Sequence, residues 1–200
     1  MKTTIQNPTR SLRFVLVAAL AALSIINGCK DDNPADNTQT PEHDPPNIVK
    51  VFLTNTATGV VDSSTWIDVD GPGGVNPTVT SLNISSDATY TGTIKLQYQL
   101  AGKPFEDLTQ DIIDEKDAHQ FFYEPMGALV GRVTVSNLDK DGRSTPLPFG
   151  LNFTLTTTAG ASVSDSLNIV LSHFDNPADK DGIKKSDESD VDINVPITLK

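Results

Sequence analysis

From residue 48 onward, the chain consists of short segments in which apolar and polar residues alternate, separated by Gly, Asp, Asn and Pro. The alternate positions of residues 90–100 carry Tyr90, Gly92, Ile94, Leu96, Tyr98 and Leu100. Successive side chains of a strand point to opposite faces, so this period of two predicts strands with one buried and one solvated face. The same pattern predicts strands over residues 48–55, 64–69, 78–84, 90–100, 119–124, 129–137, 149–157, 164–173 and 191–199.

These strands follow one another without the regular alternation of strands and helices that a parallel sheet requires. We therefore expect an all-β domain over residues 48–200, an antiparallel β-sandwich of Ig-like or Greek-key type, with a barrel as the second alternative. Residues 105–118 are ambiguous, because Phe105, Leu108 and Ile112 fit a helical stripe while the many acids equally fit an edge strand. We expect a long acidic loop over residues 174–190.

Residues 14–26 are apolar, and the residues before them carry three basic and no acidic side chains. This apolar segment falls within the roughly 7–15 residues of a secretory core and is shorter than the roughly 20 that span a bilayer. We therefore expect a signal peptide over residues 1–28, followed by Cys29 as the site of lipid attachment. An ordinary signal peptide and a short anchor helix are the alternatives.

The residues around Cys29 resemble a bacterial lipobox, with the apolar Ile26 three positions before the cysteine and Gly28 directly before it. Residues 30–32 (KDD) resemble the export signal of Bacteroidota lipoproteins. That resemblance implies the outer leaflet of the outer membrane, with lipid on Cys29 as the membrane anchor. The alternative for residues 30–32 is the solvated polar start of a spacer.

The predicted signal peptide holds three of the 15 basic residues and none of the 26 acidic ones, so the remaining chain has a net charge of −14. This charge disfavours nucleic acid and anionic membrane surfaces as partners. Beyond Cys29, residues 30–47 contain four prolines and five acids but no large apolar residue, which predicts a disordered spacer over residues 29–47. Because Cys29 is the only cysteine, disulfides and cysteine-based catalysis are excluded from the domain.

The pattern Asp-x-Asp-Gly occurs three times, at residues 68–71, 139–142 and 179–182. Two carboxylates at this spacing can reach one hard cation, as at the start of a calcium loop. Asp-Gly is also a common turn that needs no ion, and this is the interpretation we favour for the pattern in general. The last loop is the best candidate calcium site, with Asp179, Asp181, Asp187, Glu188 and Asp190 as ligands.

Two histidines lie in the predicted domain, each at one end of a predicted strand. His173 follows the apolar stripe of residues 164–173, and His119 shares a strand face with Phe121. If these strand ends meet, the two imidazoles with Glu124 or Asp175 can bind zinc or another transition metal. The alternative is two half-buried histidines whose nitrogens bind backbone groups.

Aromatic residues offer a third candidate, a platform on which a sugar ring stacks. Its members would be Trp66, Tyr90, Tyr98, Phe121, Phe122 and Tyr123, most of which the alternation places in the core. No nucleophile motif, zinc-protease motif or phosphate-binding glycine loop occurs, and none of the paired acids stands out as a general acid and base. We therefore expect a protein that is not an enzyme.

Residues 90–94 (YTGTI), 119–123 (HQFFY) and 171–174 (LSHF) together resemble a family of small Bacteroidota lipoproteins labelled as a type 1 periplasmic-binding-fold superfamily. The label implies a two-lobed α/β receptor, whereas the length and period of this chain predict a single β-domain. The resemblance implies no established activity.

Taken together, these features predict an outer-membrane lipoprotein exposed at the cell surface. We expect an accessory module that captures a metal ion or a small nutrient, beside an outer-membrane transporter. A structural or adhesive surface protein without a small ligand is the alternative, and a glycan-binding module is the third.

Overall fold

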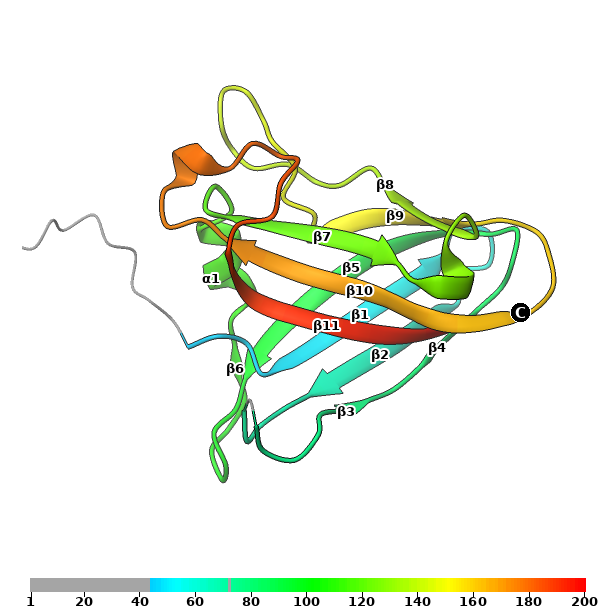
Figure 1. Cartoon of the computed structure of the whole chain (residues 1–200), viewed down its shortest axis with the longest axis horizontal. Coiled ribbons are helices and arrows are strands. Elements are labelled where there is room, and N and C mark those ends of the chain that lie inside the picture. The colour runs from blue at the N-terminus through cyan, green and yellow to red at the C-terminus, as the bar shows by residue number, and fades with distance from the viewer. Residues whose placement is uncertain (1–43, 72) are drawn as a thin grey trace, which may run out of the picture. The chain divides into compact units, whose positions relative to one another are not determined.

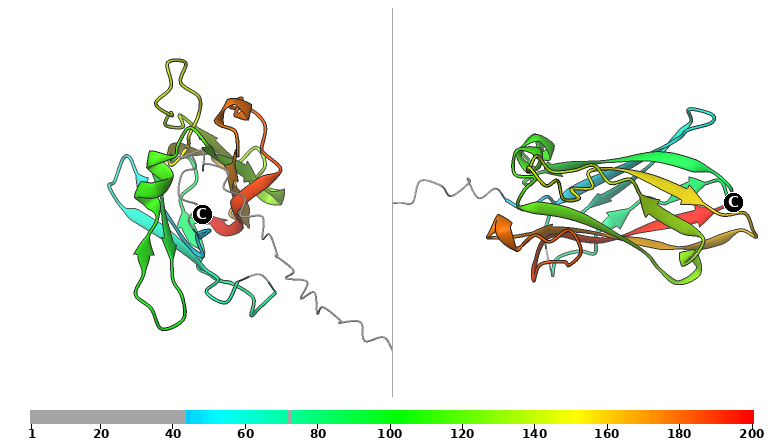
Figure 2. Two further views of the ribbon diagram at one scale, coloured as in Figure 1. Left: turned by 90° about the vertical axis from the view of Figure 1, so that its left-hand side faces the viewer. Right: turned by 90° about the horizontal axis from the view of Figure 1, so that it is seen from above.

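The computed structural model describes residues 44–71 and 73–200. Cys29, the predicted signal peptide and the predicted spacer as far as residue 43 lie outside this part of the chain. Its strands form two sheets that pack face to face, as Figures 1 and 2 show, so the predicted all-β sandwich is confirmed. Within the described residues, no helix is long and apolar enough to cross a membrane.

The larger sheet has the strand order β3-β2-β1-β5-β9-β8, with β6 also pairing with β5. Its members are β1 (Ile48–Asn55), β2 (Val61–Ile67), β3 (Thr78–Val79), β5 (Thr89–Tyr98), β6 (Glu106–Asp107), β8 (Val133–Ser136) and β9 (Asn152–Thr157). The smaller sheet has the order β4-β11-β10-β7. Its members are β4 (Leu82–Ile84), β7 (His119–Pro125), β10 (Val163–His173) and β11 (Glu188–Leu199). The pairings are antiparallel except that of β4 with β11, which is parallel.

The core lies between the two sheets and is built from the alternate residues of each strand. On β5, Tyr90, Ile94 and Leu96 are buried as the alternation predicts, whereas Leu100 is half exposed because the strand ends at Tyr98. On β11 the buried positions are Val191, Ile193, Val195, Ile197 and Leu199. Burial of these apolar side chains is the main force that holds the two sheets together.

Residues 78–84 form two short strands rather than the single predicted one. Thr80 lies between them and binds the edge of β2, accepting from the Ser64 hydroxyl (2.5 Å) through its carbonyl and from the Thr65 N–H (2.8 Å) through its hydroxyl. The chain then leaves the larger sheet, and β4 joins the smaller one. An alternating pattern cannot show this change of sheet, because it reports which residues are buried and not which strand lies beside them.

The ambiguous residues 105–118 contain both predicted alternatives, the short strand β6 and the helix α1 (Thr109–Asp114). Leu108 and Ile112 are buried as the helical stripe predicts, whereas Phe105 is mostly exposed. The carboxylate of Asp107 accepts from the backbone N–H of Thr109, and the hydrogen bonds from Thr109 hold the pKa of Asp107 below its usual value. Helix α1 leads directly into β7, whose first residue is His119.

Other boundaries also differ from the prediction. Strand β2 begins and ends earlier than predicted, β9 begins later, and β11 begins at Glu188, so the predicted acidic loop of residues 174–190 ends before that residue. Residues 129–137 contain the end of a 3-10 turn, η1 (Gly127–Leu129), before β8 begins at Val133. The end of the predicted spacer belongs to the folded domain, since Pro46 is buried and the Asn47 side chain exchanges two hydrogen bonds of 2.9 Å with the backbone of Gln99. The described part of the domain therefore begins before residue 48.

Candidate metal centre

Three strand ends of the smaller sheet meet at the end of the sandwich where α1 lies (Figure 1). β7 begins at His119, β10 ends at His173 and β11 begins at Glu188. In the antiparallel register, His173 lies directly opposite His119 on one side and opposite Glu188 on the other. The sheet topology therefore brings together residues that lie far apart in the sequence.

A β-bulge turns Asp190 toward the two histidines. Leu171 pairs with Val191 and Ser172 pairs with Ser189, which leaves Asp190 as an extra residue between the two pairs. In a regular strand Asp190 would point away from the face that buries its neighbour Val191. A bulge re-aims such a side chain, and only 15% of the Asp190 side chain is exposed.

His119 is completely buried and its two ring nitrogens face different groups. Nδ1 lies 3.0 Å from the backbone carbonyl of Glu115, the residue directly after α1. A carbonyl can only accept a hydrogen bond, so Nδ1 carries a proton. Nε2 lies 3.0 Å from Oδ2 of Asp190. Metal-binding histidines commonly donate the second ring N–H to a carbonyl in this way, which fixes the tautomer and the ring orientation.

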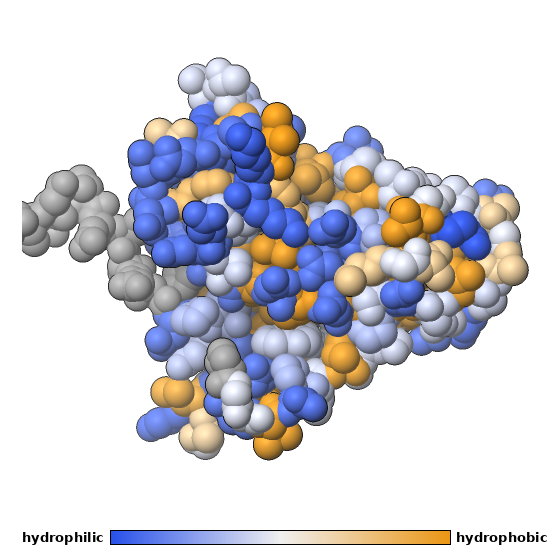
Figure 3. Space-filling view, viewed as in Figure 1, coloured by the Kyte–Doolittle hydropathy of each residue, from blue (hydrophilic) through white to orange (hydrophobic). Residues whose placement is uncertain are grey.

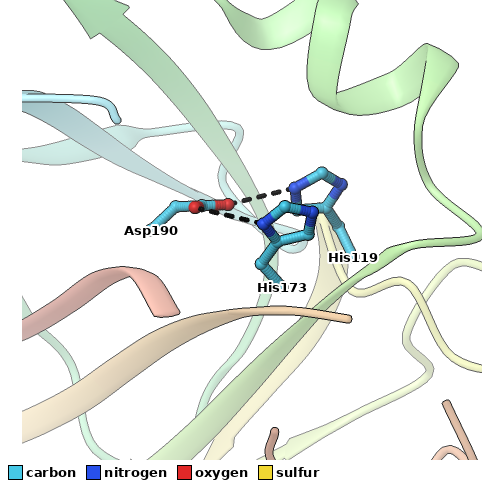
Figure 4. Close-up of side chains that lie close together, drawn as sticks. All are labelled: His119, His173 and Asp190. Carbon is cyan, nitrogen blue, oxygen red and sulfur yellow. Dashed lines mark ion pairs between the residues drawn. The ribbon is translucent and has the colours of Figure 1, made fainter. Parts of the chain in front are cut away.

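His173 is the outer member of the group, with 34% of its side chain exposed. Its ring stacks on that of His119, with centroids 4.7 Å apart and planes 11° from parallel. Nδ1 of His173 lies 3.9 Å from Oδ1 of Asp190, so the one carboxylate faces both imidazoles (Figure 4).

His119, His173 and Asp190 each offer one ligand atom, and these three atoms all lie within 4.8 Å of one another. Two imidazole nitrogens and one carboxylate suit zinc, iron, copper or nickel, whereas calcium prefers a shell made only of oxygens. Three protein ligands also leave a position open for water or another ligand. An imidazole binds a metal through a lone pair in its ring plane, so one of the two stacked rings must turn before both can bind one ion. Without an ion, Nε2 of His119 and Oδ2 of Asp190 are close enough to form an ion pair.

The structure brings together some of the ligands predicted from the sequence and separates others. It brings His119 and His173 together, but Glu124 lies apart from them and faces Lys185, with its Oε2 3.4 Å from the Lys185 Nζ. Asp175 lies beside His173 with Glu188, in a second group of three. The carboxylate between the histidines is that of Asp190, which the sequence placed in the calcium loop.

The predicted calcium shell is not assembled. In the described chain, no group suited to hold a metal contains Asp179, Asp181 or Asp187. Asp179 ends a 3-10 turn, η2 (Pro177–Asp179), and Asp181 accepts the backbone N–H groups of Ile183 and Lys184, both at 2.8 Å. These two hydrogen bonds lower the pKa of Asp181, whose carboxylate therefore acts as a turn cap.

In the other two Asp-x-Asp-Gly turns, three of the four carboxylates likewise accept from backbone N–H groups. Asp70 accepts from Val75 (2.6 Å), Asp139 from Gly150 (2.7 Å) and Asp141 from Leu147 (2.9 Å). The recurring pattern therefore stabilises turns, which is the interpretation that we favoured from the sequence.

A buried ion pair fastens the acidic loop to the rest of the domain. Lys180 is buried, and its ammonium group donates to Oδ2 of Asp141 (3.1 Å) and to the Lys116 carbonyl (2.7 Å). Burial alone would raise the pKa of Asp141, but hydrogen bonds from Leu147 and Lys180 outweigh it and lower the value. Arg143 adds a second contact to Asp141 and donates to the Pro177 carbonyl at 2.7 Å.

The aromatic residues do not offer an open stacking platform. Tyr90 and Phe121 are buried, while Trp66, Tyr98 and Tyr123 pack against the core. These five of the six candidate residues therefore serve the fold, as the alternation indicated.

Comparisons with known proteins do not indicate a function, so the function is inferred from the geometry of the site. No family model, no curated protein and no solved structure matches this chain.

Proposed function

We propose that the protein is a lipid-anchored outer-membrane protein, exposed at the cell surface, that captures a transition-metal ion beside an outer-membrane transporter. The observation that carries this proposal is the convergence of His119, His173 and Asp190 at one end of the sandwich. The orientation of the buried His119 ring also supports the proposal. Its Nδ1–H donates to the Glu115 carbonyl, which leaves Nε2 facing the Asp190 carboxylate.

The proposed location rests on the residues around Cys29 and on charge. A lipidated cysteine with more than one acyl chain gives stable membrane attachment. The net charge of −14 that remains without residues 1–28 favours the approach of cations. A cation-binding domain held at the cell surface would raise the local supply of metal for a transporter in the same membrane.

The location has its own test, which does not depend on metal. Cells fed a labelled fatty acid are expected to label the wild-type protein and not the Cys29→Ala variant. Protease added to intact cells is expected to cut the wild-type domain. A domain that resists protease while other surface proteins are cut would place it on the periplasmic side.

Metal binding is tested on the full chain purified in detergent, stripped with a chelator and titrated with zinc or calcium. Zinc is expected to bind with a stoichiometry of one, and calcium is expected to leave the protein unchanged. At a hundredfold excess over Kd, zinc adds about 2.7 kcal/mol to the free energy of unfolding. For a chain of this size the thermal midpoint then rises by roughly 5–10 °C.

Two nearly isosteric variants, Asp190→Asn and His173→Gln, are expected to weaken zinc binding. The loss should exceed the roughly 10- to 100-fold that removal of an outer-shell partner causes. Asp192→Asn, an exposed change on the same strand, and His43→Ala, a histidine outside the described domain, are the matched controls and should bind as the wild type does. A wild-type protein with no bound metal and no thermal shift would favour a structural or adhesive surface lipoprotein, and binding only to a sugar array would favour a glycan-binding module.

A further inference from the structure

A second set of potential ligands lies beside the proposed metal centre. His173, Asp175 and Glu188 each offer one ligand atom, and these atoms also lie within 4.8 Å of one another. Asp175 and Glu188 are exposed, in contrast to the buried His119. His173 belongs to both groups and is therefore a possible ligand in two adjacent positions.

An open hollow of about 500 Å³ leads to this second set. Its lining includes His173, Asp175 and Glu188, but neither His119 nor Asp190. The partly exposed His173 therefore lies between the hollow and the buried part of the first group. In Figure 3, hydrophilic residues gather at the end of the domain that carries the loop of residues 174–187.

The hollow has a strongly negative lining. Its charged residues are the acids Asp175, Asp179, Asp181, Asp187 and Glu188 and the bases Lys184 and Lys185. A cleft lined mainly by one sign of charge raises the local concentration of the opposite ion. The hollow therefore favours the entry of cations and disfavours that of anions.

We propose that a divalent transition-metal ion is first held in the hollow by His173, Asp175 and Glu188 and then passes inward to His119, His173 and Asp190. This inference rests on the proposed function, since it describes how the same centre is filled and emptied. His173 stays bound to the ion while the carboxylates of Asp175 and Glu188 are exchanged for Asp190 and His119. No electrons are transferred, and the shared ligand limits the centre to one ion at a time.

The proposal makes a kinetic prediction that can be measured by mixing the chelator-stripped full chain with Co²⁺ and following visible absorption. In the double variant Asp175→Asn/Glu188→Gln, Co²⁺ association is expected to slow at least about tenfold, because the ion loses its first ligands as well as part of the negative charge that speeds its approach. Dissociation into excess chelator should slow by a similar factor, because a lost entry position affects both directions of the same path. The equilibrium Kd then changes no more than in a variant that removes the same charge elsewhere in the hollow.

Asp179→Asn/Asp187→Asn is the matched control, because it removes the same charge from the hollow without touching the second set of ligands. This control should slow association only modestly and in a salt-dependent way, with dissociation unchanged. Asp190→Asn should instead speed dissociation, since it removes a ligand of the inner position.

The outcomes separate this inference from the proposed function. A wild type that binds one Co²⁺ per chain, with both rates unchanged in Asp175→Asn/Glu188→Gln, would overturn the entry position and leave the metal centre standing. Two Co²⁺ ions per chain would overturn the shared role of His173. A wild type that binds no Co²⁺ would overturn both proposals. Because Asp175 and Glu188 are exposed, circular dichroism is expected to show an unchanged fold in the double variant.

Discussion

Lys180 shows how a single buried charge holds the acidic loop beside the candidate metal centre. Its ammonium group has no exposed surface and is bound by the Asp141 carboxylate and the Lys116 carbonyl. Desolvation lowers the pKa of Lys180, while the charge of Asp141 opposes that change. A buried ion of this kind is stable only while its partners remain in place.

We predict that Lys180→Met destabilises the domain by about 3 kcal/mol, the lower end of the range for breaking a buried ion pair. The value lies at the lower end because Arg143 still contacts Asp141. Urea denaturation followed by circular dichroism measures the change. Lys184→Met, an exposed change in the same loop, is the control and should alter stability little. A loss below about 1 kcal/mol for Lys180→Met would show that the pair contributes little.

At the residue scale, the sequence located the two histidines but not their carboxylate. Both lie at the ends of clear strands, so their meeting could be anticipated from alternation and antiparallel pairing. Asp190 was assigned to the calcium loop because it follows Asp187 and Glu188 in the sequence. Its actual direction depends on one extra residue in β11, which no pattern of apolar positions reveals.

At the scale of elements, the bulge in β11 gives the fold its candidate site. Elsewhere β11 pairs regularly with β10, and the inward residues from Val191 to Leu199 fill the core. Bulges occur where a side chain must be re-aimed, often next to functional sites. The irregularity is confined to the strand end that lies between the histidines.

We predict that deleting Asp190 leaves the sandwich folded and abolishes metal binding. The deletion joins Ser189 to Val191, so the two pairs that now flank the bulge become consecutive and the ladder becomes regular. The thermal midpoint without metal is expected to stay within a few degrees of the wild type, and zinc should no longer raise it. Zinc binding that persists in the deletion variant would contradict the role given to Asp190.

Long alternating strands were the easiest elements to predict. β1 and β10 agree with the sequence within one residue, because each buries one complete face. The short elements β3, β4 and η1 were merged or missed, and β6 was left open between strand and helix, because two or three residues carry no measurable period. Their positions are set by side-chain contacts such as those of Thr80 rather than by local pattern.

At the scale of the whole molecule, the domain is strongly acidic, and many of its carboxylates support turns. Asp107, Asp141, Asp165 and Asp181 each accept hydrogen bonds that lower their pKa values in the folded state. These groups belong to different loops and strands, so the effect of acid on them is spread over the whole fold.

We predict that acid destabilises the domain. The pKa of each of these four carboxyls is lower in the folded than in the unfolded state, so their stabilisation is complete above the unfolded value near about 4. It is lost as the pH falls through the lower folded-state values, because the unfolded chain then binds more protons. Thermal melts of the metal-free protein between about pH 5 and pH 2 measure the effect. A midpoint that does not fall over this interval would contradict the account.

The central claim is that His119, His173 and Asp190 bind one transition-metal ion, and anomalous diffraction from crystals of the zinc-loaded full chain tests it most directly. The account predicts a zinc peak roughly 2.0–2.2 Å from Nε2 of His119, from a ring nitrogen of His173 and from an oxygen of Asp190. A zinc-loaded crystal whose anomalous peaks all lie away from these three side chains, or that shows no peak at all, would contradict it.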